Sequence, residues 1–272
     1  MSVVAYQGEA GAYSEEGAVA LFPDTEHRPF PSIRTVFESV EVGRAHWGLV
    51  PMDNSQAGSI NETYDLFLRH GLHLVGETIV RVDHSLLALP GSTIDDVREV
   101  VSHPQAIAQC EEFLSGLEVN VRAEYNTAGA AKRIADGKLD GVAAIASRRA
   151  GELYGLESLA DRIQTYPDNY TRFGALSRDP APLEEPNKSS LVFGVGHVAG
   201  SLYRCLGAFA ERHLNLTKLE SRPRPGRPWE YVFYADVDAA AQLPQMVEAL
   251  AALSEHATFT RLLGTYAKAT PL

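Results

Sequence analysis

A proline-rich segment separates two parts of the chain that have different hydrophobic patterns. Arg178-Asp-Pro-Ala-Pro-Leu-Glu-Glu-Pro-Asn-Lys188 combines three prolines with charged residues and has no apolar period. This composition is typical of a linker, so we expect one at residues 179–189. The chain has 272 residues, which is enough for two domains of ordinary size. The linker therefore predicts two separately built parts.

Before the linker, short apolar segments alternate with helical patterns, which is typical of α/β domains. Leu74–Ala88 contains strand material and no long helix, so we expect the chain to cross into a second lobe there. A return crossing is expected near Tyr166–Leu176. The expected lobes are residues 1–77 with 163–178, and residues 78–162. A cleft between two lobes is a common place for a small ligand to bind.

After the linker, the pattern predicts a strand, a helix, two strands, a helix and a strand, which is the ferredoxin-like order. The predicted elements are Ser190–Gly194, Gly200–Arg212, Leu214–Ser221, Tyr231–Val237, Leu243–Ala252 and Thr258–Thr265. Arg222–Pro228 is a predicted turn that joins two of these strands as a hairpin. We place this domain at residues 190–272.

Hydroxyl side chains stand where several helices of the first part should begin. They are Ser14, Ser59, Ser102 and Thr127. Ser59 with Glu62, and Ser102 with Gln105, have the spacing of a capping box. Each hydroxyl could simply cap its helix, which is worth about 1 kcal/mol. Helix starts also bind carboxylates, so several of them together could bind a small polyanion.

Charge and composition exclude some classes of function. The formal net charge is -11, and no basic patch suits nucleic acid. The N-terminus carries no basic segment followed by an apolar run, and no segment reaches the roughly 20 apolar residues of a membrane span. Cys110 and Cys205 lie in apolar helical patterns, so we expect free buried thiols, although a disulfide is possible. These features predict a cytoplasmic protein.

Gly194-Val-Gly196-His-Val-Ala-Gly200 follows a predicted strand and is similar to a dinucleotide-binding turn. Too few residues follow it for a full dinucleotide-binding sheet, and a hairpin stands where that fold needs a parallel crossover. We therefore expect no nucleotide cofactor. The sequence also contains no clustered metal-ligand motif, and we expect no metal.

Four segments of the first part, read in order, resemble the prephenate dehydratase family and in particular its plant-type arogenate dehydratase branch. They are Ala5-Tyr-Gln-Gly-Glu-Ala-Gly-Ala-Tyr-Ser14, Val50-Pro-Met-Asp-Asn-Ser-Gln-Ala-Gly-Ser-Ile60, Val101-Ser-His-Pro-Gln-Ala106 and Asn169-Tyr-Thr-Arg-Phe173. After the linker, Leu216-Thr-Lys-Leu-Glu-Ser-Arg-Pro223 is similar to the phenylalanine-binding motif of ACT domains. The resemblance implies a two-lobed catalytic domain over residues 1–178, like type II periplasmic binding proteins, followed by a ferredoxin-like βαββαβ ACT domain.

The resemblance implies a lyase of phenylalanine biosynthesis that removes carbon dioxide and water from prephenate to give phenylpyruvate, without a cofactor. Thr171 would donate a hydrogen bond to the leaving hydroxyl, Arg172 would clamp a carboxylate and Phe173 would form an apolar wall. Alternatively, Thr171 could satisfy nearby backbone, and Arg172 could pair with Asp168 at the surface. The expected substrate-binding residues are Ser14, Asn54, Ser55, Gln56, Ser102, Gln105, Thr127 and Asn169.

The resemblance also implies phenylalanine as an effector and a homodimer or homotetramer paired through ACT domains. The expected effector-binding residues are Gly200, Ser201, Leu202, Glu220, Ser221, Arg222 and Pro223. An ordinary edge charge is the alternative role for Glu220.

Three residues depart from the family pattern. Asp53 stands where a glutamate is usual, Ala12 where many bacterial members have threonine, and Ser201 where alanine is usual. The first two leave the choice of substrate open, so arogenate is an alternative to prephenate. A non-catalytic amino-acid sensor is the alternative from another class, because two-lobed clefts and ACT domains can both be pure binders.

Overall fold

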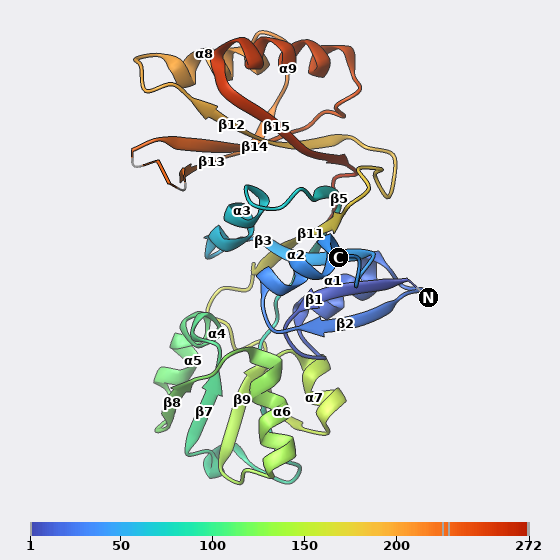
Figure 1. Ribbon diagram of the computed structural model, residues 1–272. Coiled ribbons are helices and arrows are strands. Elements are labelled where there is room, and N and C mark those ends of the chain that lie inside the picture. Colours follow the sequence, from blue (N-terminus) through green and yellow to red (C-terminus); the bar gives the residue numbers. More distant parts are fainter. Residues whose placement is uncertain (1, 225, 228, 271–272) are drawn as a thin grey trace. The chain divides into compact units, whose positions relative to one another are not determined.

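A computed structural model describes residues 2–224, 226–227 and 229–270. Pro225 and Pro228 of the predicted turn, and the last two residues of the predicted second domain, lie outside the described residues. The described chain forms two compact units (Figure 1): residues 2–60 with 78–173, and residues 61–77 with 174–270. Residues 61–77 thus group with the C-terminal part, and the domain borders expected at 178 and 190 stay a prediction.

The first sheet has the strand order β2-β1-β3-β11-β5, with the short strand β4 paired to β3. Strand β1 is buried along nearly its whole length and pairs in parallel with β2 and β3, as is typical of covered α/β sheets. The strands are β1 (Val3–Gln7), β2 (Glu26–Phe30), β3 (Trp47–Asn54), β4 (Gly58–Ser59), β5 (His73–Arg81) and β11 (Tyr170–Ser177). The helices between them are α1 (Tyr13–Leu21), α2 (Ile33–Glu41) and α3 (Asn61–Phe67).

The second sheet has the strand order β10-β6-β9-β7-β8 and is covered on both faces. Alternate residues of one strand show this: Ala144 and Ala146 pack into one core with Ala131, while Ala143 and Ile145 pack into another. The strands are β6 (Ser85–Ala88), β7 (Glu99–Ser102), β8 (Asn120–Ala123), β9 (Val142–Ala146) and β10 (Glu157–Asp161). The helices are η1 (Ile94–Asp96), α4 (Pro104–Gln109), α5 (Glu111–Ser115), α6 (Thr127–Gly137) and α7 (Arg148–Tyr154).

Two segments connect the first sheet with the second, which confirms the two-lobed architecture. Residues 82–84 lead from β5 to β6, and residues 162–169 lead from β10 back to β11. The two segments bind each other: Val82 N–H donates to the Asn169 carbonyl at 2.8 Å, and Ile163 N–H donates to the His84 carbonyl at 3.0 Å. The lobes also meet at Gly11, where an added Cβ would lie 2.8 Å from Ala150 Cα. The connecting segments thus bind each other through their backbones, and the lobes are in close contact at Gly11.

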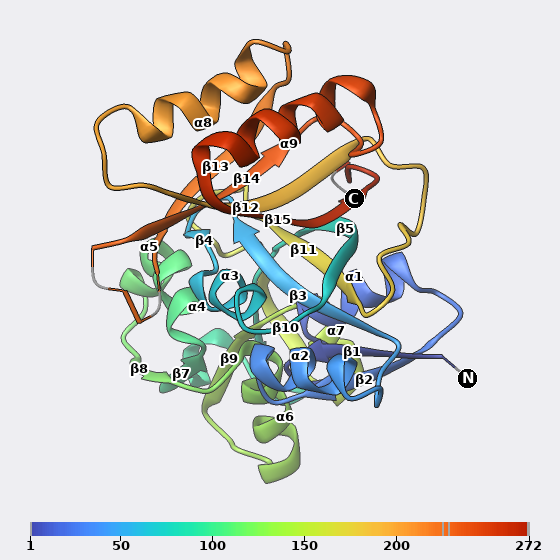
Figure 2. The ribbon, with the colours of Figure 1, turned by 45° about the horizontal axis from the view of Figure 1, so that its top comes forward.

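The third sheet is antiparallel, with the strand order β13-β14-β12-β15. Its elements are β12 (Lys188–Val195), α8 (Ser201–Ala210), β13 (Leu216–Pro223), β14 (Tyr231–Val237), α9 (Pro244–His256) and β15 (Ala257–Tyr266). This is the predicted ferredoxin-like order. Figure 2 shows α8 and α9 side by side on one face of the sheet, where Cys205, Phe209 and Met246 are buried. Because β13 and β14 form an antiparallel hairpin, Gly194–Gly200 does not belong to a parallel dinucleotide-binding sheet.

Residues 61–77 pack against this third sheet within the second unit. The Tyr234 hydroxyl donates to the Tyr64 carbonyl at 2.5 Å, and their rings lie 4.9 Å apart. Arg261 donates to the carbonyls of Phe67 and Leu72 at 2.6 and 2.9 Å. A Cβ at Gly264 would lie 1.8 Å from the Leu74 oxygen, so only glycine allows this approach. The segment is therefore built into the second unit.

Several details differ from the sequence prediction. Cys110, in an apolar helical pattern, does not lie within one continuous helix, because it ends α4 and precedes α5. Strand β2 was not predicted because Glu26–Phe30 is mostly polar and exposed, and α2 was missed although Ser32 caps it in a capping box. Both cysteines are buried free thiols, as expected, and burial raises the pKa of Cys110 to about 12. Among the described residues, no helix is long and apolar enough to cross a bilayer.

A buried lysine fixes the start of β12 in the second unit. Lys188 Nζ lies 2.9 Å from Glu77 Oε2 and 3.3 Å from Asp236 Oδ2. The side chains of Lys188 and Glu77 are only 6% and 2% exposed. Removing one partner of a buried ion pair leaves the other charge without compensation, which is strongly destabilising.

We expect Lys188→Met to lower the free energy of unfolding of the second unit by about 3–5 kcal/mol, because two carboxylates would stay buried without their cation. Lys268→Met is the matched control, since Lys268 pairs with Asp238 at 3.0 Å with both side chains more exposed. The control should cost less than about 1 kcal/mol. Urea unfolding of both variants measures the difference. Equal losses in the free energy of unfolding would show that the buried ion pair stabilises the protein no more than the exposed one.

Candidate active site

The side-chain amide of Asn54 forms the centre of a polar cluster at the end of β3. Its Oδ1 accepts the backbone N–H groups of Gln56 at 3.1 Å and Ala57 at 2.9 Å, which closes the turn between β3 and β4. Gly58 has a φ of +79° in this turn, a conformation that favours glycine. Backbone N–H groups only donate, so they fix which end of the buried Asn54 amide is oxygen.

The nitrogen end of Asn54 faces β11. Asn54 Nδ2 lies 2.7 Å from Asn169 Oδ1 and 3.1 Å from Thr171 Oγ1. Thr171 thus accepts a hydrogen bond from Asn54, and its own hydroxyl hydrogen can be donated to another group. A donor that binds the oxygen of a hydroxyl also polarises it and strengthens its donation.

Arg172 lies on the opposite face of β11 from Thr171. Its Nε donates to Asp53 Oδ2 at 2.8 Å, and its Nη2 binds the same oxygen. Consecutive residues of a strand point to opposite faces of a sheet. The Asp53–Arg172 pair therefore lies on one face, and the Asn54–Thr171 pair lies on the other. The surface pairing with Asp168 that the sequence left open is not the one observed. Phe173, which shares a face with Thr171, is 3% exposed.

Two buried amides carry nitrogen atoms without a hydrogen-bond partner among the described residues. They are Asn169 Nδ2 and Asn126 Nδ2. Asn169 is fully buried, and Asn126 caps α6 by accepting the Gly129 N–H through its Oδ1. An unpaired buried donor costs about 1–3 kcal/mol, so these two nitrogens are candidates for ligand contacts.

Gln109 was missed by the sequence analysis, and it reaches the cluster from the second lobe. Its Nε2 lies 3.5 Å from Asn54 Oδ1, and its Oε1 lies 2.9 Å from His84 Nε2. The capping-box spacing drew attention to Gln105, which lies one helical turn earlier on the same side of α4. A second amide four residues after Gln105 was the available signal.

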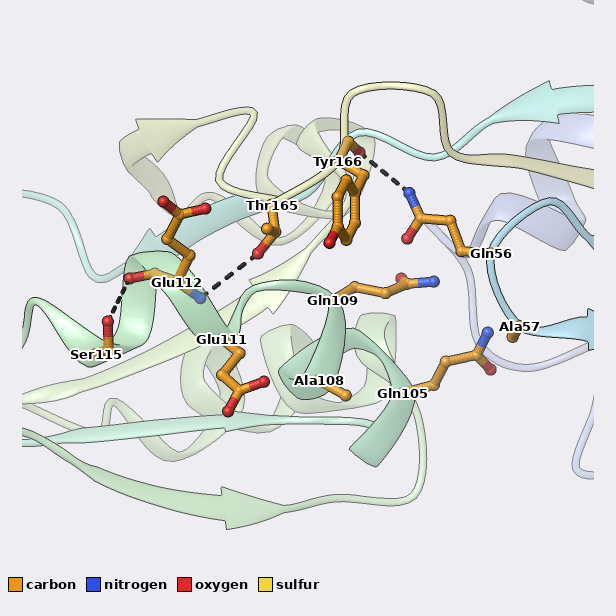
Figure 3. A pocket seen from close by; sticks show the side chains of 10 residues that line it. All are labelled: Gln56, Ala57, Gln105, Ala108, Gln109, Glu111, Glu112, Ser115, Thr165 and Tyr166. Atoms are coloured by element: carbon orange, nitrogen blue, oxygen red, sulfur yellow. Dashed lines mark hydrogen bonds between the residues drawn. The ribbon is translucent and has the colours of Figure 1, made fainter.

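Beside this cluster lies an open pocket of about 540 Å³ (Figure 3). Gln56, Gln105 and Gln109 extend into one end of it from both lobes. Gln56 Nε2 donates to the Tyr166 carbonyl at 3.1 Å, and Glu111 and Glu112 line the other end. None of the ten lining residues is basic. The pocket thus joins amide donors from two lobes with two carboxylates.

The hydroxyls expected at helix starts are mostly not caps. Ser14 donates to the Gln7 carbonyl and Ser102 donates to the Ile145 carbonyl at 2.6 Å, so both brace strands. Ser59 pairs with Asp53 as part of β4. Thr127 is the first residue of α6. The N-caps of α1, α4 and α6 are Ala12, His103 and Asn126, because the chain turns into each helix at these positions.

Ser55 connects the end of β3 to the start of β11. Its hydroxyl donates to the Asp168 carbonyl at 3.0 Å and accepts the Tyr170 N–H at 2.9 Å. Ser55 N–H donates to the Tyr170 carbonyl at 2.8 Å. Ser55 thus braces the two strands, and its contact with the substrate stays a prediction.

Near the start of α1, one carboxyl has an unusual pKa. Burial, with smaller contributions from Glu15 and Asp83, raises the pKa of Glu16 to about 7, although Arg149 acts in the opposite direction.

No group of three or more His, Cys, Asp or Glu side chains that could hold a metal occurs among the described residues.

The expected effector residues fall into two separate places in the second unit. Gly200, Ser201 and Leu202 line a pocket of about 410 Å³ at the start of α8. The residues 220–223 lie on β13, at the edge of the sheet, and do not line that pocket. Arg222 donates to Asp65 of α3 at 2.9 and 3.3 Å.

The prephenate dehydratase family model matches residues 4–181, and the ACT domain model matches residues 189–255. Arogenate dehydratase 1 of Petunia hybrida is 44% identical over 97% of this chain and 66% of its own length. Arogenate dehydratase/prephenate dehydratase 6, chloroplastic, of Arabidopsis thaliana is 43% identical over 97% of this chain and 68% of its own length. The chain thus spans about two thirds of the length of these relatives.

Solved structures agree with these matches. Prephenate dehydratase of Arthrobacter aurescens, in complex with L-Phe, has a TM-score of 0.89 at 30% identity and covers 98% of this chain and 90% of its own. A protein described as GqqA, a novel type of quorum quenching acylase, has a TM-score of 0.88 at 34% identity and covers 98% of both chains. These matches and the fold confirm the resemblance read from the sequence, and the chain belongs to the prephenate dehydratase family.

Proposed function

We propose that the chain is a dehydratase that converts prephenate to phenylpyruvate, with loss of carbon dioxide and water. The observation that supports this most directly is the Asn54–Thr171 hydrogen bond of 3.1 Å. It leaves the Thr171 hydroxyl hydrogen for a group of the substrate. The family match supports the reaction, and the chain's own residues supply the geometry.

In this reaction, the bond between the ring and its carboxylate breaks, and its electron pair moves into the ring as carbon dioxide leaves. The bond between the ring and its hydroxyl then breaks, and the departing oxygen collects negative charge. A preorganised hydrogen-bond donor that faces this oxygen lowers the barrier. Threonine is too weak an acid to be a full proton donor at neutral pH, so we assign Thr171 a hydrogen bond and leave the proton to water.

The substrate carboxylates need donors, and the site offers amides. We propose that Asn169 Nδ2 and Asn126 Nδ2, both buried and unpaired, donate to them. Gln105 and Gln109 extend the amide set in the pocket. Arg172, held by Asp53 on the other face of β11, then supports the strand that carries Thr171. The carboxylate clamp expected for Arg172 stays a prediction beside this role.

Arogenate is the second candidate substrate, and one observation favours it. Arogenate carries an ammonium group where prephenate has a keto group. Glu111 and Glu112 line the pocket, which contains no basic residue, so its charge suits an ammonium better than a second anion. The ratio of the two rates in purified protein decides between the substrates.

We expect purified protein to turn over prephenate, arogenate or both at neutral pH, followed as phenylpyruvate and phenylalanine. Thr171→Ala should lower kcat roughly 10²–10³-fold, the cost of losing one preorganised donor. Thr171→Ser is the matched control, because it keeps the hydroxyl and should stay within about tenfold of the original kcat.

No turnover of either substrate by folded protein would refute the dehydratase proposal and favour the amino-acid sensor. Full activity of Thr171→Ala would instead refute the role of Thr171 alone.

We also propose that phenylalanine regulates the enzyme through the ACT domain. The A. aurescens relative was crystallised with L-Phe, and the pocket at Gly200–Leu202 offers a site of suitable size. Arg222 of the expected effector motif forms an ion pair with Asp65 of α3. Helix α3 begins two residues after β4, and β4 forms a hairpin with β3, which ends at Asn54. This connection would pass a change at β13 to the catalytic cluster.

Asp65→Asn should weaken the effect of phenylalanine on the rate while the basal rate stays close to normal. Allosteric coupling is typically about 5–150-fold in affinity, so a loss of most of it is measurable. The matched control is Glu230→Gln, which breaks the Arg224–Glu230 pair at 3.0 Å without touching α3. An unchanged response in Asp65→Asn, with or without a response in the control, would contradict this coupling.

The location and the assembly of the chain are proposals too. Two buried free thiols, Cys110 and Cys205, fit a reducing compartment such as the cytoplasm. The names of several relatives place those proteins in the chloroplast. We propose a homodimer or homotetramer in which pairing of ACT domains brings residues 220–223 of one chain to the pocket of another.

A further inference from the structure

His84 lies in the first connecting segment, and its ring is buried between groups from both lobes. The residue is 2% exposed. Its N–H donates to Gln164 Oε1 at 3.0 Å, and its carbonyl accepts the Ile163 N–H at 3.0 Å. Its ring nitrogens lie 2.9 Å from Gln109 Oε1 and 3.2 Å from the Tyr13 hydroxyl. Both the N–H and the carbonyl of the His84 backbone are therefore held by hydrogen bonds.

The orientation of the Gln109 amide follows from Asn54. Two backbone N–H groups occupy Asn54 Oδ1, so the atom of Gln109 that faces this oxygen must be a donor. That atom is Nε2, at 3.5 Å. A half-turn of the Gln109 amide would bring two acceptor oxygens together. Gln109 therefore presents its oxygen to His84.

The orientation of Gln109 determines which nitrogen of the His84 ring carries the proton. Burial lowers the pKa of His84, against smaller opposing effects of Gln109 and Asp83, so the ring is neutral at neutral pH. Because Gln109 presents Oε1, the proton must sit on Nε2. Nδ1 then carries no hydrogen and lies 3.2 Å from the Tyr13 hydroxyl, which donates mainly to the Asp83 carbonyl at 2.5 Å. This hydroxyl keeps its hydrogen, since burial raises the pKa of Tyr13 well above its ordinary value.

We propose that His84 is a positioning residue of the dehydratase site, whose Nε2–H holds Gln109 with its amide NH2 toward Asn54 and the Thr171 cluster. His84 acts through Gln109 and makes no contact with the substrate. The chain of hydrogen bonds runs from Tyr13 through His84, Gln109 and Asn54 to Thr171, and it crosses between the lobes twice. This inference rests on the proposed dehydratase function.

Kinetics of three variants test the role. His84→Leu removes the donor and should lower kcat roughly ten- to a hundredfold, as the loss of other groups that orient a functional side chain does. KM should change less than kcat, because the orientation matters most when the hydroxyl leaves. His84→Gln places an amide NH2 near the position of Nε2 and should restore most of the activity.

A double variant separates positioning from packing. His84→Leu should slow the Gln109→Ala protein little further, because the group that His84 orients is already gone. A folded His84→Leu protein with unchanged kcat, or equal losses in the Leu and Gln variants, would overturn the proposal.

NMR of the ¹⁵N-labelled histidine rings gives a readout that needs no activity. At neutral pH, His84 should show a protonated Nε2 and an unprotonated Nδ1, whereas the Nδ1–H tautomer would overturn the inference. If His84→Leu does not fold, this measurement still tests whether His84 donates from Nε2. It also separates the two proposals: a protein that turns over neither substrate but shows the Nε2–H tautomer refutes the dehydratase and keeps the hydrogen-bond chain.

Discussion

The polarity of the whole cluster depends on two backbone N–H groups that bind one side-chain oxygen. Gln56 and Ala57 can only donate, so Asn54 must present its oxygen to them and its nitrogen to β11. From this follow the acceptor role of Thr171, whose hydroxyl hydrogen is left for another group, and the orientation of Gln109. A tight turn between β3 and β4 thereby sets the hydrogen bonding of Thr171 on β11, 117 residues away in the sequence.

The same turn leads directly to the segment that belongs to the second unit. Residues 61–77 begin just after β4 and pack on the third sheet through Tyr64 and Leu74. The buried pair of Glu77 with Lys188 closes this segment at its far end. The chain thus runs from the turn that carries Asn54 directly into an element that packs on the third sheet. Regulation through this element needs only that an effector binds one of its arrangements better than another.

The architecture could be predicted from the sequence because it depends on patterns among residues that are close in the sequence. The proline-rich linker, the strand and helix periods and the βαββαβ order each depend on neighbouring residues, and the structure and the comparisons confirm the architecture that they predicted. The site was less accessible. Asn54 and Thr171 were named from the family motif, but their hydrogen bond joins residues 117 positions apart.

For other residues of the site, the structure shows contacts that the sequence does not reveal. Arg172 was expected to clamp a carboxylate because of the family motif and its forked donors; the structure shows it paired with Asp53, on the face of β11 opposite Thr171, and the clamp stays a prediction. Ser102 was read as a helix cap, but its hydroxyl lies at a strand end and binds the neighbouring strand. Gln109 offered only its spacing from Gln105 and His84 offered no motif signal, since their importance comes from a contact between residues 25 positions apart.

A crystal structure of the Thr171→Val protein, grown with prephenate or arogenate, tests most directly whether Thr171 and Asn169 contact the substrate. Valine keeps the shape of threonine without its hydroxyl, so the substrate should persist. The account predicts a ring bound between the lobes, with its hydroxyl toward residue 171 and its carboxylate on Asn169 Nδ2. A substrate bound elsewhere, with Asn169 Nδ2 still unpaired, would contradict it.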